Sequence, residues 1–488
     1  MNNKQRVLRT FIMICLGFTA LSAKSFADDR MAGSVSKRNF GASKPAPQTS
    51  APYTKTAILD TNTDVLESRG LLHGTDSLGT YLWENSNKGE IFDLVEDLPP
   101  LHSYPTLHNL NIRALKTAAD VTLMSGSNAT NENEGRDFLT LRLEKLFAMG
   151  HFADTAALYT QSPFEPYHER FARVGVSAIF ISGQQSLACL EAKSVQERFG
   201  ALKFWKQMNR LCDFIMFDKF TAPPMIEDEN EEPKPAFIDA YLKDKNKVFT
   251  PDSLETLAKA PPVALSFLIS NARISYKKIT TEPSALSPMI RSLLLTDKTL
   301  PQDMREAIED INRKYEPETS EEQSRIKNES FTTGSTKKRL FSYIAYLVTN
   351  NFSDVEALSQ EEFLRLLDES DPIDRAIVGI IAEKLDKQSK LHNYGGRDIY
   401  EKHADLTFDD NYVMQSTGLM NSLQEARNDN RLGEVILLSS IILHESTSDN
   451  TKPDVIGEVI DSFVTVGLTN EAKQLTKEFL LSFNIKGE

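Results

Sequence analysis

The sequence is poor in cysteine and tryptophan and has no apolar run long enough to cross a membrane. Three cysteines and two tryptophans occur in 488 residues, and Cys15 lies inside an N-terminal apolar stretch, Phe11 to Leu21. That stretch is far shorter than the roughly 20 residues of a spanning helix. The later run Val435 to Leu443 is also short and is interpreted as a buried helix. No cysteine stands after the first run where a lipid anchor would need it, which argues against a lipoprotein.

The sequence also has fewer basic than acidic residues, 55 against 69. The formal net charge is −14, and no basic patch interleaved with aromatic residues offsets it. Such a surface repels nucleic acid and anionic lipid headgroups. We therefore expect no nucleic-acid partner. The short apolar runs predict no membrane span once any leader is removed.

The sequence also lacks the motifs by which enzymes of this size are recognised. Its eight histidines include no H-E-x-x-H and no pair at the i, i+4 spacing that places two zinc ligands on one helical face. The stretch Gly74 to Gly79 has Thr75 where a nucleophile elbow requires glycine, so it is interpreted as a turn. Ser335 and Lys338 match S-x-x-K, but within a stretch that we expect to be a loop. The sequence predicts a protein that is not an enzyme and has no catalytic residue, cofactor or metal.

The N-terminus has the features of a secretory signal peptide. Lys4, Arg6 and Arg9 precede the apolar run, and small residues close the segment at Ser25 to Ala27. Cleavage after Ala27 would remove residues 1–27 and place the mature chain in the periplasm or outside the cell. The alternative, an uncleaved membrane anchor, requires a longer apolar segment.

Composition divides the remaining chain. Residues 28–56 are rich in Ser, Ala, Pro and Lys without an apolar period, which predicts a disordered linker. Two further polar interruptions, at 223–235 and 316–338, are interpreted as solvated loops. The expected ordered regions are an N-terminal helical-repeat region, 57–222, a middle helical region, 236–315, and a C-terminal helical-repeat region, 339–488.

Within these regions apolar residues recur with a period of 3.6, and alternation with a period of two is nearly absent. Expected turns near Gly150, Gly183, Gly200 and Gly467 follow apolar-striped segments. Gly150 and Gly183 are 33 residues apart, and Gly433 and Gly467 are 34 apart. Such spacing is typical of helix-turn-helix repeats. The sequence thus predicts an all-α fold of stacked antiparallel hairpins, a tetratricopeptide-like α-solenoid. An irregular all-helical domain is the alternative, because the pairs share no strict consensus.

The two cysteines outside the leader predict a disulfide. If Gly200 is the turn between helices at 186–199 and 201–217, Cys189 and Cys212 lie at nearly the same height above it. Facing positions on packed helices bring Cα atoms to roughly 4 to 6 Å, which a disulfide tolerates. The alternative is two unrelated buried thiols. A structural bond is expected, because the chain has no C-x-x-C to activate a thiol.

Several motifs carry a family resemblance. They are Trp83, Trp205 with its flanking cysteines, the Arg431-x-Gly433-Glu434 motif and the Gly467-x-x-x-Glu471-Ala472 motif. With the segments around them, roughly 70 to 218 and 415 to 484, they resemble a set of long secreted, alanine-rich helical proteins of alphaproteobacteria. Some of those proteins carry labels borrowed from antifreeze glycopeptides. The resemblance implies compartment and architecture and supplies no catalytic residue.

Repetition without a catalytic motif predicts a non-enzymatic scaffold of the periplasm or cell envelope, whose groove binds a protein or peptide partner. One alternative is a purely structural component of the envelope with no discrete ligand. The other is a cell-wall enzyme or its helical subunit, because some lytic transglycosylases carry a long helical superhelix. That alternative requires a lysozyme-like module with a catalytic glutamate, whereas the last 70 residues have the pattern of two more helical pairs.

Overall fold

The computed structural model describes residues 65–126, 137–161, 168–217, 238–279, 283–315, 335–349, 360–385, 417–444 and 453–482. They belong to one compact unit, Ala57–Glu488. The expected signal peptide, the linker and the loop at 223–235 lie outside them. Within these ranges the regular structure is helical, with three isolated β-bridges and no strand. The prediction of an all-α protein is confirmed.

The described residues form these α-helices: α3 Lys88–Asp97, α4 Pro105–Lys116, α5 Phe138–Ala148, α6 Phe152–Thr160, α7 Glu169–Ile181, α8 Gln185–Ser194, α9 Gln196–Phe199, α10 Lys203–Phe217, α11 Asp239–Lys243, α12 Leu254–Ala258, α13 Pro262–Ser270, α14 Pro288–Leu295, α15 Gln302–Arg313, α17 Thr336–Thr349, α18 Gln360–Glu369, α19 Pro372–Leu385, α21 Thr417–Asn428, α22 Leu432–His444, α23 Pro453–Thr465 and α24 Thr469–Ser482.

Local sequence explains where many of these helices begin. The Asn87 side chain accepts hydrogen bonds from the backbone N–H groups of Gly89 and Glu90 at the start of α3. Asp137 caps α5 in the same way, and Ser287 caps α14. A helix leaves its first N–H groups without partners inside the helix, so these side chains satisfy donors that would otherwise lack a partner in the chain.

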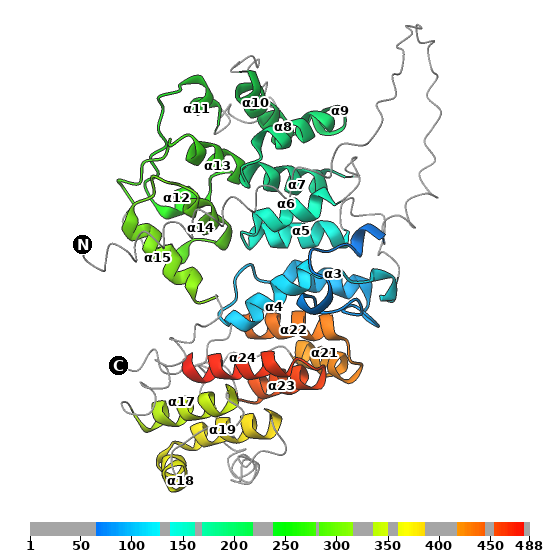
Figure 1. Ribbon diagram of the computed structural model, residues 1–488, viewed down its shortest axis with the longest axis vertical. Coiled ribbons are helices and arrows are strands. Elements are labelled where there is room, and N and C mark those ends of the chain that lie inside the picture. The colour runs from blue at the N-terminus through cyan, green and yellow to red at the C-terminus, as the bar shows by residue number, and fades with distance from the viewer. Residues whose placement is uncertain are drawn as a thin grey trace, which may run out of the picture. The chain divides into compact units, whose positions relative to one another are not determined.

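Three of the four expected glycine turns are present (Figure 1). Gly150 joins α5 to α6, Gly183 joins α7 to α8, and Gly467 joins α23 to α24. Each has a positive φ, between 83° and 91°, in the left-handed region where a side chain is strained. Helices joined in this way pack on each other, as do α6 and α7.

Gly200 and Gly433 do not form the helix-connecting turns that the sequence pattern predicts. The helix expected at 186–199 is divided at Val195 into α8 and α9, and Gly200 ends α9 with right-handed backbone angles. Gly433 lies inside α22, and the turn before that helix is formed by Asn430, with φ 55°. The 34-residue interval from Gly433 to Gly467 therefore does not connect equivalent turns. A Cβ on Gly433 would lie 2.2 Å from the Trp83 ring, so close packing explains this glycine.

Helices distant in sequence pack together. The first helices, α3 and α4, lie against α22, and α4 also contacts α24. Helix α24 packs in turn on α17, and α23 packs on α19. In the middle of the chain, α13 contacts α7 and α14 contacts α5 (Figure 1). Helices near both ends of the described chain therefore share one hydrophobic core.

The apolar run at 435–443 is a buried helix, as expected, because α22 buries almost its whole surface. Among the residues that the structure describes, no helix has the length and apolar character that a bilayer crossing requires. The loop expected at 316–338 overlaps a helix at its end, because α17 begins at Thr336.

Candidate functional site

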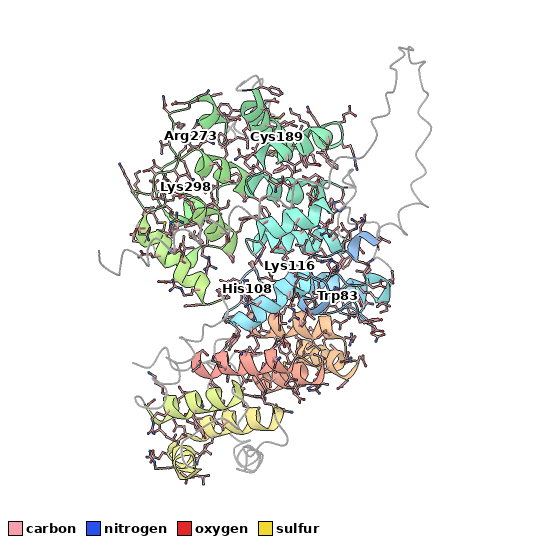
Figure 2. The ribbon with its side chains drawn as sticks, in the orientation of Figure 1. Trp83, His108, Lys116, Cys189, Arg273 and Lys298 are labelled. Carbon is pink, nitrogen blue, oxygen red and sulfur yellow. A yellow bond between two sulfur atoms is a disulfide. The ribbon has the colours of Figure 1, made fainter. Side chains whose placement is uncertain are left out.

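A disulfide joins Cys189 on α8 to Cys212 on α10, and the two Cα atoms are 5.3 Å apart. Both side chains are fully buried, and Figure 2 labels Cys189. Trp205, also fully buried, lies on the same helix as Cys212 and donates from Nε1 to Glu169 Oε1 at 3.2 Å. The bond fastens the α8–α10 hairpin from inside its core. Its position matches a structural role.

The stretch Gly74 to Gly79 and the Ser335–Lys338 pair both form local backbone hydrogen bonds. Gly74–Asp76 is one turn of 3₁₀-helix, and the Ser77 hydroxyl donates to Gly74 O at 2.8 Å, so this stretch is a turn as expected. Ser335 precedes α17, and its hydroxyl accepts a hydrogen bond from the Lys338 N–H at 3.4 Å, so Lys338 lies in a helix and not in the expected loop. The backbone of Lys338 therefore explains the S-x-x-K spacing without reference to its amine.

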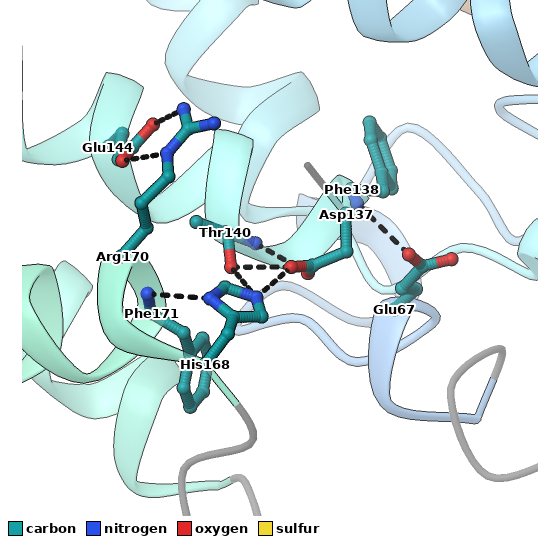
Figure 3. A network of polar contacts seen from close by, with 8 residues as sticks. All are labelled: Glu67, Asp137, Phe138, Thr140, Glu144, His168, Arg170 and Phe171. Carbon is teal, nitrogen blue, oxygen red and sulfur yellow. Dashed lines mark hydrogen bonds and ion pairs between the residues drawn. The ribbon is translucent and has the colours of Figure 1, made fainter. Parts of the chain in front are cut away.

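One buried cluster resembles a hydroxyl, imidazole and carboxylate triad: Thr140, His168 and Asp137 (Figure 3). His168 Nε2 contacts Asp137 Oδ2 and lies 3.1 Å from Thr140 Oγ1. His168 Nδ1 accepts a hydrogen bond from the Phe171 N–H at 3.1 Å. The Thr140 hydroxyl donates to Asp137 Oδ2 at 2.7 Å.

A catalytic triad needs the hydroxyl and the carboxylate on different ring nitrogens. Here both lie at Nε2, and the backbone donor at Nδ1 places the ring proton on Nε2. The imidazole therefore has no free nitrogen to accept the Thr140 proton. Burial raises the pKa of Asp137, but hydrogen bonds from His168 and Thr140 outweigh it and hold that pKa below its usual range. The cluster joins the caps of α5 and α7 and has a structural geometry.

Arg142 is a second buried polar centre. It is fully buried, and its guanidinium donates to four backbone carbonyls, those of Glu67, Arg69, Leu115 and Thr117, at 2.7 to 3.0 Å. Burial lowers its pKa to about 10, so it stays charged at neutral pH. All four acceptors belong to the chain itself, and Arg142 thereby holds the segment before α3 and the end of α4 on α5.

Two histidines are buried where α4 meets its neighbours. His102 Nε2 lies 2.9 Å from Ser440 O of α22, and its Nδ1 accepts from the Tyr104 N–H at 3.0 Å. The His108 ring packs edge-on against Tyr315, with the ring centroids 4.8 Å apart. Burial lowers the pKa of His102 to about 3 and that of His108 to about 4. Both rings are therefore neutral at physiological pH.

An apolar pocket is the strongest candidate for a ligand site. Its volume is about 370 Å³, at the lower end of the range for small-molecule sites. It is formed by α5, α7, α10, Ile238 and the first turn of α13. Ten of its lining residues are apolar: Phe147, Val174, Phe204, Met208, Leu211, Ile238, Pro261, Pro262, Val263 and Ala264. Such a lining favours the binding of an apolar group, because the group leaves water when it binds.

Four polar residues complete the pocket: Glu144, Arg173, Ser177 and Gln207. Glu144 is engaged by Arg170 in a two-pronged ion pair of 3.0 and 2.6 Å (Figure 3). The guanidinium of Arg173 approaches Glu169 at 3.7 Å, and its side chain is 47% exposed. Within the described chain, neither the Ser177 hydroxyl nor the Gln207 amide makes a hydrogen bond. The pocket thus offers one weakly paired cation and two unused polar groups.

Across the described ranges, no group of three or more histidine, cysteine or acidic side chains is arranged to hold a metal ion. Comparisons with protein-family models, with curated proteins and with solved structures return no match for this chain. The resemblance to secreted helical proteins of alphaproteobacteria therefore stays a prediction.

The sequence predicts the disulfide but gives little indication of the pocket. Its residues come from five separate segments, and each looks like an ordinary apolar stripe when taken alone. The Pro261-Pro262 pair is the one local signal, because it begins α13 with an apolar surface and no side-chain cap.

Proposed function

We propose that this chain is a non-enzymatic binding protein of the periplasm or cell envelope, in which stacked helical hairpins form a solenoid-like scaffold for a protein or peptide partner. The observation that carries the proposal is the open apolar pocket, which helices of successive hairpins form together with the middle region. The pocket combines a mainly apolar wall with a few convergent polar groups, the usual composition of a binding site.

Two further features support the proposal. Left-handed glycine turns at Gly150 and Gly183 repeat one hairpin connection along the N-terminal helices. The Cys189–Cys212 disulfide fits an oxidising compartment, since such bonds are rare in the cytosol. The predicted signal peptide at 1–27 would take the chain there.

Site-specific photocrosslinking in living cells tests the proposal. A photoreactive amino acid replaces Gln207 in the pocket, and a matched control replaces Arg313, which is 63% exposed on α15. We expect a partner to crosslink at position 207 and not at 313, and to be lost when Arg173 is changed to Gln. Crosslinks of equal yield at both positions would contradict a pocket-centred binding function. Clearing of peptidoglycan by the purified chain in a zymogram would contradict the non-enzymatic proposal.

A further inference from the structure

The polar groups of the pocket indicate which chemical group of a partner binds there. Arg173 is a cation at the rim of an apolar wall, and its nearest counter-charge, Glu169, is 3.7 Å away and also accepts from Trp205. Glu144 is neutralised by Arg170. An anionic group seated beside Arg173 would therefore gain a partner without displacing a strong ion pair.

Ser177 and Gln207 indicate the chemical class of ligand that the pocket binds. A serine hydroxyl and a glutamine amide each both donate and accept hydrogen bonds. An ionised fatty acid has no hydrogen-bond donor for the oxygen atoms of these two side chains. A peptide backbone has both an N–H donor and a C=O acceptor. The unused donors and acceptors of the pocket thus match a peptide better than a simple amphiphile.

The pocket volume sets the size of the occupant. A space of about 370 Å³ lies near the bottom of the small-molecule range, so it suits the end of a chain better than a long extended segment. The ten apolar lining residues call for a large apolar side chain.

We propose that the pocket binds the free C-terminus of a partner peptide whose last residue is large and apolar. The last side chain enters the apolar wall, the terminal carboxylate pairs with Arg173, and the final backbone amide bonds to Ser177 and Gln207. This inference rests on the proposed function and specifies the partner of the same pocket.

The test uses the full chain and a set of fluorescent hexapeptides of Ser and Gly that differ in their last residue. Each peptide is made with a free carboxylate and with a C-terminal amide. We expect peptides ending in Phe or Leu to bind in fluorescence anisotropy, and amidation to weaken them about tenfold, the effect of losing a partly exposed charge-assisted bond.

Variants assign the effect to the pocket. Arg173→Gln should weaken the free-acid peptides about tenfold and abolish the preference over the amides. Arg313→Gln removes the same charge from an exposed position on α15 and should leave binding unchanged. Gln207→Ala should weaken both forms alike, because it removes a contact to the backbone.

Three outcomes would overturn the inference: no binding of any peptide of the set, equal binding of acid and amide forms by the wild-type chain, or binding of decanoate that is tighter than that of the best peptide and is lost in Arg173→Gln. The proposed function fails separately, when crosslinking at position 207 captures no partner. If capture at 207 succeeds with a partner that binds through an internal segment, the function stands and the C-terminal inference is wrong.

Discussion

The buried His102 and His108 should make the fold sensitive to acid. Burial lowers the pKa of His102 from 6.5 to about 3, and that of His108 to about 4. An unfolded chain protonates both rings below 6.5, whereas the folded chain resists until the pH approaches the lowered values. These histidines therefore contribute stability that is fully present above pH 6.5 and is lost as the pH falls toward 3 to 4.

The magnitude follows from proton linkage. Between neutral pH and about pH 5, each ring lowers the free energy of unfolding by about 2 kcal/mol, and the two together lower it by about 4 kcal/mol. That is a large fraction of the roughly 5 to 15 kcal/mol by which folded domains are typically stable. The geometry gives the physical reason. Both nitrogens of His102 are already used, and a proton on Nδ1 would face the Tyr104 N–H.

Two buried glutamates act in the opposite direction. Burial raises the pKa of Glu67 and of Glu434, so protonation of these groups favours the folded chain as the pH falls. The total slope of stability against pH combines both effects. The difference between the wild type and a histidine variant isolates the imidazole contribution.

The assay is urea unfolding at about pH 7.5 and about pH 5, followed by helical circular dichroism and by tryptophan emission, whose agreement establishes a single transition. The variant is His102→Gln, whose amide can still donate to Ser440 O. We expect the wild type to lose about 2 kcal/mol more than this variant between the two pH values. The control is His73→Gln, an exposed histidine, which should follow the wild type. An equal loss in wild type and His102→Gln would refute the reasoning.

Three further predictions concern the cysteines, the α22 junction and the leader. Replacing Cys189 and Cys212 with Ala should lower the free energy of unfolding by about 3 kcal/mol, and reductant should then have no further effect on the urea midpoint, in contrast to the wild type. Gly433→Ala should cost about 1 to 3 kcal/mol in the same assay, because its Cβ would lie 2.2 Å from the Trp83 ring, and an unchanged midpoint would show that this junction is loosely packed. N-terminal sequencing of the protein from its native cell should begin at Asp28, and a chain that begins at Met1 would contradict export with cleavage after Ala27.

Local sequence determined much of the secondary structure, because its causes are local. A period of 3.6 predicts helices wherever an apolar face must be buried, and Asp137 and Gly150 mark the start of α5 and the turn after it through backbone hydrogen bonding and φ. The prediction of the disulfide is confirmed, although one of its premises is wrong. Cys189 and Cys212 lie on α8 and α10, and the short helix α9 lies between them where the sequence predicts one turn at Gly200.

Only the tertiary structure decided which hairpins meet. An apolar stripe specifies that a face is buried and leaves its partner open, because the hydrophobic effect has no direction. Nothing in the sequence joins Trp83 to Gly433, yet their contact packs α22 against the first helices and explains why a glycine stands inside α22. The pocket has the same origin: α5, α7, α10 and α13 each contribute ordinary apolar residues, and a binding site exists only where those helices are packed together.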